Sequence, residues 1–338
     1  MPLLDVKDLR LHFHTRKGLV RAVNGVSFAL EAGEMLGIVG ESGSGKSVTC
    51  NALMGLNPSP PARIEGGSVR FCGKDILNTS NSELRDIRGR EIAMIFQDPM
   101  TALNPYMRIG DQLIEPLLLH GMATKTEARN RAVETLRSIG MPQPEDCMKR
   151  WPHEFSGGMR QRVMIAMALI SRPRLLIADE PTTALDVTVQ AQILELLASL
   201  RQSGREALAL MAIILISHDL SVVAESCDRV MVMYAGQVME SAPAREIWQS
   251  PMHPYTHALL RAIPASTASG TKLTVIPGEP PDMTQDWQGC PFAPRCAYAQ
   301  DACRENEINL QDISPNHQTA CLRVQKNEID LTEDARHK

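Results

Sequence analysis

The stretch Met35-Leu-Gly-Ile-Val39 runs directly into Gly40-Glu-Ser-Gly-Ser-Gly45-Lys46-Ser47. Its first part is almost wholly apolar, which is typical of a strand buried on both faces of a sheet. Its second part matches the pattern G-x-x-x-x-G-K-[S/T], in which a glycine-rich turn joins such a strand to a helix and surrounds a phosphate with backbone N–H groups. We expect a helix from about Lys46 to Met54, and the stretch therefore predicts an α/β nucleotide-binding fold.

Each residue of this loop is a candidate ligand of a nucleotide. The glycines let backbone N–H groups curl around the phosphates, and the following helix adds the partial positive charge of its N-terminus. We expect Lys46 to reach the β- and γ-phosphates and the Ser47 hydroxyl to bind Mg²⁺. The candidate nucleotide-binding residues of the loop are Gly40, Glu41, Ser42, Gly43, Ser44, Gly45, Lys46 and Ser47.

Two later stretches, Leu175–Ala178 and Ala212–Ile216, are as apolar as Met35–Val39. An amphipathic stretch from Thr188 to Leu200 separates them. Apolar strands that alternate with a helix are typical of a parallel sheet covered by helices. We therefore expect a parallel α/β core.

Other segments predict what surrounds this core. Residues 3–39 alternate apolar and polar positions around turn signals, which is typical of short strands with one solvated face. Residues 58–67 are rich in Pro and Gly and indicate a loop before a strand pair near residues 68–71. Residues 80–170 carry mostly helical patterns broken by prolines. We expect a helix-rich insert there.

The segment Leu175-Leu-Ile-Ala-Asp179-Glu180 ends an apolar strand with two adjacent carboxylates. Phosphoryl transfer needs a carboxylate that binds Mg²⁺ and a second group that orients the attacking water. Successive residues at the end of a strand can point toward these different tasks. We assign Asp179 to the metal and Glu180 to the water.

A second glycine-rich segment, Ser156-Gly-Gly-Met-Arg-Gln161, precedes an apolar helical run from Val163 to Ile170. Ser156 is well placed as the N-cap of that helix. Gly157 and Gly158 leave the helix N-terminus open to an anion. Capping by itself explains the segment as well as anion binding does, so its function depends on the motifs that accompany it.

Together these motifs resemble those of the ATP-binding-cassette (ABC) ATPases, over roughly residues 3–250. The segment that begins at Ser156 resembles the signature sequence of that family, with Met159 where the commonest form has Gln. The resemblance implies an α/β fold: a P-loop NTPase (RecA-like) parallel-sheet core, an antiparallel β subdomain and a helical subdomain with the signature at about residues 98–170. It implies an ATP-binding domain over residues 1–250, with ATP and Mg²⁺ as cofactors.

The resemblance also implies roles for single residues. Gln97 resembles the loop glutamine that senses Mg²⁺ and the γ-phosphate, and His218 resembles the switch histidine. Asp186, in Ala184-Leu-Asp186, lies in what resembles the loop that crosses the dimer interface, and Phe13 lies where the family usually stacks an aromatic ring on adenine. The expected catalytic residues are Glu180, His218 and Gln97, and the expected Mg²⁺ ligands are Ser47, Gln97 and Asp179.

Three segments narrow the resemblance. Gln97–Pro105, Pro152–Met159 and His253–Leu260 are similar to the nucleotide-binding subunits of dipeptide and oligopeptide importers. This resemblance implies that the chain hydrolyses ATP to power peptide uptake. Its implied partners are a second, non-identical ABC ATPase subunit, two transmembrane permease subunits and an extracytoplasmic peptide-binding protein. Ser156, Gly157 and Gly158 are expected to contact the nucleotide held by the second cassette.

Other functions stay open at this point. A related cassette could serve the uptake of nickel or of an antimicrobial peptide, and a soluble cassette could act on nucleic acid or ribosomes. The soluble class usually carries two cassettes or a long coiled-coil insert, neither of which is visible here. The chain has 35 Lys and Arg against 39 Asp and Glu, a formal charge of −4, which excludes a generally basic surface. We therefore expect no nucleic-acid partner.

The longest uncharged apolar run, Ala207–Ile216, is well short of the roughly 18 residues that cross a bilayer. The first residues of the sequence lack both an apolar signal core and a cleavage site. We expect a peripheral protein on the cytoplasmic side of the inner cell membrane.

The composition changes near Ser250, and we expect residues 251–338 to form a C-terminal peptide-importer extension. Four of the eight cysteines crowd into residues 290–321. Structural zinc sites usually include a Cys spacing of about two to four residues, which is absent here, whereas iron–sulfur spacings vary more. The segment Gly289–Cys296 resembles the tail of importers that carry a four-iron cluster. We therefore expect a [4Fe–4S] cluster, with zinc or free thiols as alternatives, on Cys290, Cys296, Cys303 and Cys321.

Overall fold

The computed structural model describes residues 1–182, 187–202, 211–263 and 275–331. They form two compact units. Unit 1 contains residues 1–30, residues 35–77 and the described residues from 217 onward. Unit 2 contains residues 31–34 and the described residues between 78 and 216. The N-terminal strands and the C-terminal extension, which are far apart in the sequence, therefore belong to the same unit.

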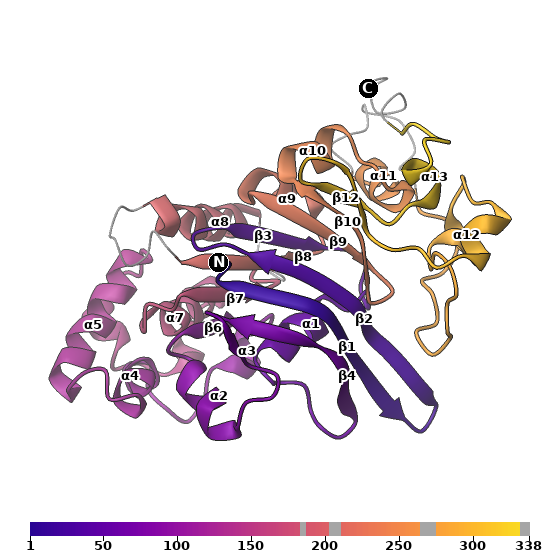
Figure 1. Ribbon diagram of the computed structural model, residues 1–338. Helices are drawn as coiled ribbons and strands as arrows, with labels where there is room; N and C mark the ends of the chain where they lie inside the picture. Colours follow the sequence, from indigo (N-terminus) through magenta and orange to yellow (C-terminus); the bar gives the residue numbers. More distant parts are fainter. Residues whose placement is uncertain (183–186, 203–210, 264–274, 332–338) are drawn as a thin grey trace. The chain divides into compact units, whose positions relative to one another are not determined.

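An antiparallel sheet in unit 1 has the order β2-β1-β4-β5. Its strands are β1 (Leu4–Thr15), β2 (Gly18–Leu30), β4 (Ala62–Phe71) and β5 (Lys74–Asp75). Figure 1 shows β1, β2 and β4 side by side. The predicted loop at residues 58–67 is wrong from Ala62 onward. Backbone pairing with β1 overrides the local Gly signal, because Gly67, at φ +95°, lies where the register between the two strands shifts.

The other strands of unit 1 follow the order β11-β12-β10-β9-β3. Strand β3 pairs in parallel with β9, and the pairs beyond β9 are antiparallel. These strands are β3 (Met35–Val39), β9 (Arg229–Tyr234), β10 (Gln237–Pro243), β11 (Gln311–Ser314) and β12 (His317–Thr319). All residues of β3 are buried, as its apolar composition predicts. The helices are α1 (Lys46–Leu53), α9 (Leu220–Ser226), α10 (Ala244–Gln249), α11 (Pro254–Arg261), α12 (Asp301–Glu305) and α13 (Leu322–Gln325).

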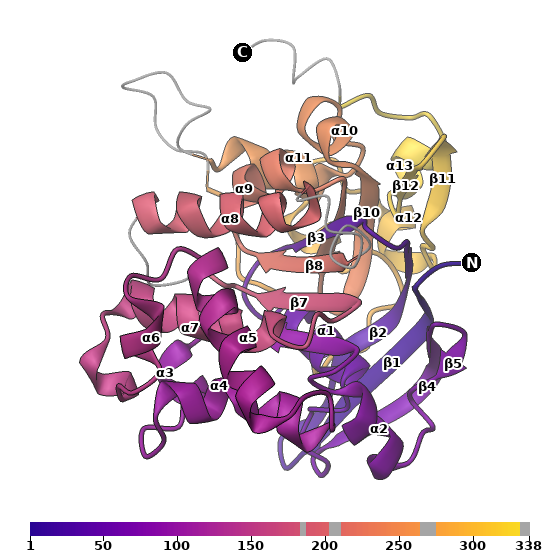
Figure 2. The ribbon, with the colours of Figure 1, turned by 90° about the vertical axis from the view of Figure 1, so that its left-hand side faces the viewer.

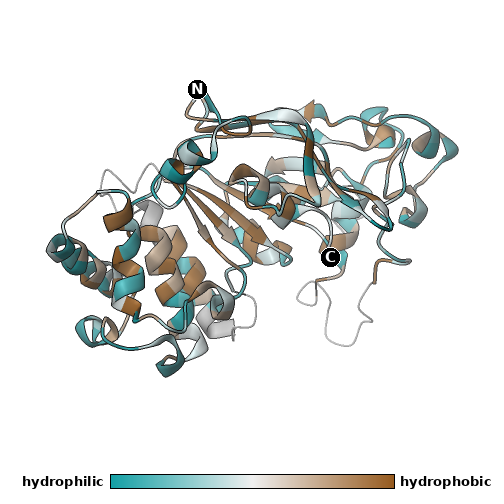
Figure 3. Ribbon diagram, turned by 90° about the horizontal axis from the view of Figure 1, so that it is seen from below, coloured by the Kyte–Doolittle hydropathy of each residue, from teal (hydrophilic) through white to brown (hydrophobic). Residues whose placement is uncertain are grey.

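Unit 2 combines parallel strands with helices. Strand β7 (Leu175–Asp179) pairs in parallel with both β6 (Ile92–Ile95) and β8 (Ala212–Ser217). The buried strands are drawn in brown in Figure 3, and the helices between β6 and β7 are gathered together in Figure 2. The helices of unit 2 are α2 (Asn81–Ile87), α3 (Pro99–Ala102), α4 (Ile109–Leu119), α5 (Lys125–Ser138), α6 (Pro144–Cys147), α7 (Gly157–Leu169) and α8 (Val187–Gln202). The predicted helix-rich insert is confirmed, although it also contains the short strand β6.

A buried ion pair attaches the C-terminal extension to β10. The Nε2 atom of His317 lies 2.7 Å from Oε1 of Glu240, and its Nδ1 atom lies 3.2 Å from Oε2 of Glu246. The side chain of Glu240 is wholly buried, and that of His317 is 2% exposed. Burial by itself lowers the pKa of His317, but hydrogen bonds and charge attraction to the two carboxylates outweigh burial and raise this pKa above its usual 6.5.

We expect the substitution His317→Ala to lower the free energy of unfolding of unit 1 by about 3–5 kcal/mol at pH 6, since it leaves Glu240 buried without its cation. A raised pKa in the folded state stabilises the protein fully below pH 6.5, and this contribution is lost as pH rises through the higher folded pKa. Urea unfolding at pH 6 and pH 9 should therefore show a difference between wild type and variant that shrinks with pH.

The matched control is His14→Ala, because His14 pairs with Glu65 at 2.6 Å on the exposed surface. We expect this control to change stability much less than His317→Ala, since surface pairs contribute little. A wild-type advantage over His317→Ala that stays constant or grows from pH 6 to pH 9 would contradict the assignment.

Candidate functional site

The phosphate loop of unit 1 joins β3 to α1, in the context that its sequence motif requires. A Cβ atom on Gly40 would lie 2.2 Å from the carbonyl oxygen of Met233, and one on Gly45 would lie 2.3 Å from that of Ala22. Both glycines also have positive φ angles, +152° and +100°. Steric contact with backbone therefore fixes glycine at both positions, and the loop is held against β9 and β2.

Lys46 holds its ammonium group inside the curl of this loop. The Nζ atom donates to the carbonyl oxygens of Gly40 at 2.8 Å and Glu41 at 2.9 Å, and the side chain is buried. A buried cation among backbone N–H groups at a helix N-terminus is a site for an anion such as a phosphate. The geometry of the loop, with glycines where a Cβ would clash, fits a bound phosphate chain.

Two side chains that sequence reasoning missed contact this loop from the C-terminal extension. The hydroxyl oxygen of Tyr255 accepts a hydrogen bond from the backbone N–H of Glu41 at 2.9 Å. The guanidinium of Arg295 pairs with the Glu41 carboxylate at 2.6 Å. The contacts join residues 214 and 254 positions apart, so no local pattern could have indicated them.

The two predicted carboxylates lie at the end of β7 in unit 2. Asp179 is the last residue of the strand and is buried, whereas Glu180 is partly exposed and has a positive φ of +45°. The backbone N–H of Glu180 donates to the carbonyl oxygen of Ile216, on the neighbouring strand β8, at 3.1 Å. Such a backbone conformation is costly for a residue other than glycine and recurs at functional sites, where neighbouring structure maintains it.

Gln97 contacts Glu180 directly. Its Nε2 atom donates to Oε2 of Glu180 at 3.0 Å. The reason is topological: β6 and β7 are parallel neighbours, with Ile95 opposite Ala178, so the residues that follow each strand meet at the same sheet edge. The structure thus brings together two of the residues that the sequence predicts to be catalytic.

The predicted N-cap at Ser156 is confirmed, because its hydroxyl accepts from the backbone N–H of Met159 at 3.4 Å at the start of α7. Ser156 and Gly157 are both exposed, and a Cβ atom on Gly157 would meet no atom within 4 Å. Packing inside this unit therefore does not require glycine at position 157. Farther along α7, the buried Gln161 donates to the carbonyl oxygen of Pro181, next to Glu180.

Other predicted residues lie at separate places. His218 is exposed in the turn after β8. The next residue, Asp219, is the N-cap of α9, and its Oδ1 atom accepts a hydrogen bond from the backbone N–H of Ser221 at 2.9 Å. Phe13 is half-buried on β1, opposite Val20 and Ala62. Asp186 lies outside the described residues.

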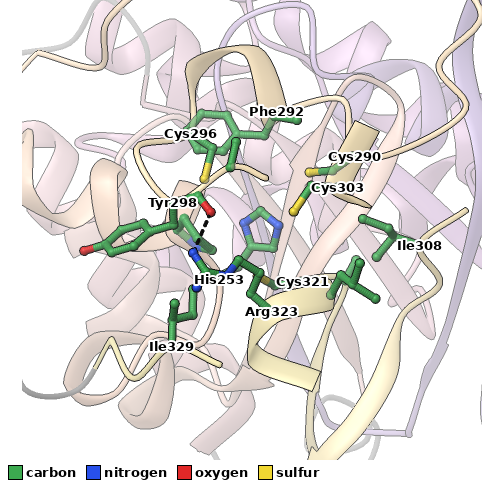
Figure 4. Close-up of a pocket in the computed structure, with 15 residues that line it drawn as sticks. His253, Cys290, Phe292, Cys296, Tyr298, Cys303, Ile308, Cys321, Arg323 and Ile329 are labelled. Carbon is green, nitrogen blue, oxygen red and sulfur yellow. Dashed lines mark hydrogen bonds between the residues drawn. The ribbon is translucent and has the colours of Figure 1, made fainter. Parts of the chain in front are cut away.

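The predicted [4Fe–4S] cluster is wrong. The four cysteines of the extension line one pocket with His253, as Figure 4 shows, but no group of three or more His, Cys, Asp or Glu side chains in the described ranges could hold a metal ion. The space that a water-sized sphere can reach in this pocket is about 20 Å³, close to that of one water molecule. The same findings exclude the zinc alternative.

Burial shifts the pKa values of three of these thiols. It raises the pKa of Cys290 to about 12 and that of Cys321 to about 11, and it raises the pKa of Cys296 as well. These environments favour the neutral thiol over the thiolate. The four side chains are free cysteines.

Within the described part of the chain, we find no helix with the length and apolarity needed to cross a bilayer.

Comparisons with known proteins give two family matches. The family described as "ABC transporter" matches residues 23–183, and the one described as "Oligopeptide/dipeptide transporter, C-terminal region" matches residues 239–303. The first contains the phosphate loop, Gln97, the signature segment and both carboxylates. The second contains Tyr255 and Arg295.

Curated relatives match over most of the chain. The oligopeptide transport ATP-binding protein OppD of Escherichia coli (strain K12) is 54% identical over 321 residues, which cover 95% of this chain and 93% of the relative. The dipeptide transport ATP-binding protein DppD of Bacillus subtilis (strain 168) is 50% identical over 319 residues, 94% of each.

A solved structure agrees with these relatives. The dimeric structure of MJ0796, described as a bacterial ABC transporter cassette, is 27% identical, with a TM-score of 0.63 over 72% of this chain and 99% of that one. The predicted P-loop α/β fold is confirmed. The chain belongs to the ABC transporter family, among its oligopeptide and dipeptide transport ATP-binding proteins.

Proposed function

We propose that this chain is the ATP-hydrolysing subunit that powers the uptake of dipeptides or oligopeptides through a membrane ABC importer. The observation that carries the enzymatic part is the hydrogen bond between Gln97 and Glu180 at the end of β7. The match of residues 239–303 to the C-terminal region of peptide transporters favours peptides over nickel or nucleic acid. Its relatives in Escherichia coli and Bacillus subtilis are peptide transport proteins by name.

The roles proposed for unit 1 follow from the phosphate loop. Backbone N–H groups of residues 40–45 and the Lys46 ammonium bind the phosphates of ATP, and the Ser47 hydroxyl is a ligand of Mg²⁺. Phe13 supplies an aromatic face for the adenine ring. His218, which is exposed at the end of β8, contacts the terminal phosphate.

The roles proposed for unit 2 follow from the carboxylates. Asp179 is a ligand of the metal, which neutralises charge on the phosphates, and Gln97 is a further ligand. Glu180 accepts a proton from the attacking water, and the amide of Gln97 orients the Glu180 carboxylate. The positive φ of Glu180 and its hydrogen bond to Gln97 occur at the same residue, which fits backbone strain maintained at a functional site.

The proposed assembly contains a second ABC ATPase subunit, two transmembrane permease subunits and an extracytoplasmic peptide-binding protein. Ser156 and the glycines after it cap the nucleotide held by the second ATPase, which agrees with the open space around Gly157. The chain then lies on the cytoplasmic side of the inner membrane as a peripheral subunit. The residues 1–250 and 251–338 are the proposed ATP-binding domain and extension.

Affinity purification of the tagged chain from its native membrane in mild detergent tests this assembly. We expect mass spectrometry to find two multi-span proteins and a second ABC ATPase in the retained material. Ribosomal or DNA-repair proteins without any membrane protein would overturn the importer assignment and leave the ATPase assignment standing.

We expect the substitution Glu180→Gln to keep ATP affinity within about twofold and to lower the ATPase rate of the assembled complex by about 10²–10⁴-fold, because a general base typically contributes this much. Equilibrium binding of Mg-ATP and phosphate release measure the two effects. The control Glu115→Gln changes an exposed carboxylate on α4 of the same unit and should leave both unchanged. Wild-type turnover by Glu180→Gln would show that Glu180 is not the base.

We expect the substitution Lys46→Ala to raise the dissociation constant for ATP by about 10- to 100-fold, since it removes a cation that makes charge-assisted hydrogen bonds. Equilibrium dialysis with radiolabelled ATP measures the change on the full chain. Lys74→Ala, an exposed lysine on β5, is the control. Equal affinity of wild type and Lys46→Ala would place the phosphates elsewhere.

A further inference from the structure

Arg295 joins the C-terminal extension to the phosphate loop through two parallel hydrogen bonds. Its Nη1 and Nη2 atoms lie 2.6 Å and 3.0 Å from Oε2 and Oε1 of Glu41. The Arg295 side chain is 6% exposed and that of Glu41 is 23% exposed. A buried, bidentate arginine–carboxylate pair is a strong and directional contact.

Each N–H of the Arg295 guanidinium already has an acceptor. Besides the two bonds to Glu41, Nη1 donates to the hydroxyl of Tyr234 at 3.2 Å, and Nε donates to the carbonyl of Pro277 at 2.9 Å. The remaining donor, on Nη2, lies 3.4 Å from the carbonyl of Ile276. An arginine offers five donors, so this one is fully used by the protein and acts on the loop rather than on a ligand.

Aromatic rings enclose the same contact. The ring centroid of Tyr234 lies 4.6 Å from that of Tyr255 and 5.4 Å from that of Phe292. The guanidinium carbon of Arg295 lies 5.8 Å from the Tyr234 ring. Phe292, Tyr234 and Tyr255 are all buried, and they surround the Arg295 end of the pair with apolar surface. The extension thus contributes two buried aromatic rings, those of Tyr255 and Phe292, beside this contact.

Glu41 is held at both its backbone and its side chain. Its N–H donates to Tyr255, its carboxylate accepts from Arg295, and its carbonyl oxygen accepts from Lys46 at 2.9 Å. A shift of Glu41 would therefore move an acceptor that positions the Lys46 ammonium. Glu41 therefore connects the extension to the Lys46 ammonium.

The charge of Glu41 is the second part of the argument. A carboxylate in a loop that binds phosphates repels them, and the repulsion is strong where little water screens it. Arg295 neutralises this carboxylate with a cation that has no other acidic partner in the contact. A loop with Glu41 therefore depends on Arg295 for its affinity toward an anion.

We propose that Arg295 is a positioning residue for ATP binding, by which the C-terminal extension fixes and neutralises Glu41 of the phosphate loop. The proposal rests on the proposed function, because it assumes that the loop binds ATP. It assigns to the extension a direct effect on nucleotide affinity. The extension then sets the concentration of ATP at which the cassette is loaded.

The test compares Mg-ATP binding by the full-length chain in a double-mutant cycle. We expect Arg295→Gln to raise the dissociation constant by about tenfold, because it leaves the Glu41 carboxylate without its partner. We expect the double variant Glu41→Gln, Arg295→Gln to recover to within about threefold of wild type, since the uncompensated charge is gone. Glu41→Gln alone completes the cycle.

A merely structural role of Arg295 predicts the opposite pattern. If the substitution only loosened the fold, a second substitution at the same contact would weaken binding further or leave it unchanged. The penalty of Arg295→Gln should also shrink as the ionic strength is raised from about 0.05 M to about 0.5 M, because salt screens the carboxylate. In the assembled complex, KM for ATP should rise by about tenfold while kcat changes by less than about twofold.

Arg304→Gln is the matched control, because Arg304 is an arginine of the same extension whose side chain is 53% exposed and pairs with nearby Asp301. It should bind ATP as wild type does. Arg295→Lys keeps the positive charge but loses the bidentate geometry of the guanidinium. Its dissociation constant for Mg-ATP should fall between those of wild type and Arg295→Gln. This variant tests the pair if Arg295→Gln does not fold.

The outcomes separate the two proposals. Tight ATP binding by wild type together with equal binding by Arg295→Gln, or a double variant as weak as Arg295→Gln, overturns the role of Arg295 and leaves the ATPase assignment intact. Failure of the wild-type chain and complex to bind ATP overturns the proposed function, and the role of Arg295 falls with it.

Discussion

The close approach of backbone to backbone at the phosphate loop is the constraint on which unit 1 depends. Gly40 lies against the carbonyl of Met233 on β9, and Gly45 lies against that of Ala22 on β2, each too closely for a Cβ atom. One loop therefore touches both sheets of the unit. Any side chain at either glycine would separate these sheets before it affected a ligand, so the anion site and the packing of the unit cannot be changed independently.

The charges around this loop are arranged in a chain of contacts. The Lys46 ammonium is bound to loop carbonyls, one of which belongs to Glu41, and the Glu41 carboxylate is bound in turn to Arg295. Each charge is partly buried and has a partner, as desolvated charges require. In unit 2, the Glu180 carboxylate accepts a hydrogen bond from the side-chain amide of Gln97. A carboxylate that accepts a proton is served better by an amide partner than by an arginine, which would lower its basicity.

The C-terminal extension is held by ion pairs and a small apolar cluster. His317 pairs with the buried Glu240 on β10, and Cys321, Val324 and Leu331 form a core with Met252 and Tyr298. Cys321 contributes a small buried side chain to this packing, and its raised pKa fits that role. The extension is thus attached on one side to the edge of the sheet and on the other to the phosphate loop, and it can stabilise the loop without taking part in the chemistry.

The sequence by itself determined the local features: the buried strand before Gly40, the glycine loop, the N-cap at Ser156 and the carboxylates at the end of β7. These depend on residue type and on neighbours within a few positions, which a single chain displays directly. Strand β6 inside the helical insert, the start of β4 at Ala62 and the pairing of Arg295 with Glu41 were decided by tertiary structure, because the stabilising partners are distant in sequence. For the cysteines, the sequence pattern predicted a site that the tertiary structure does not form. Their spacing allowed a cluster, but the folded chain places no three or more such side chains, among the residues that the structure describes, where they could hold a metal ion.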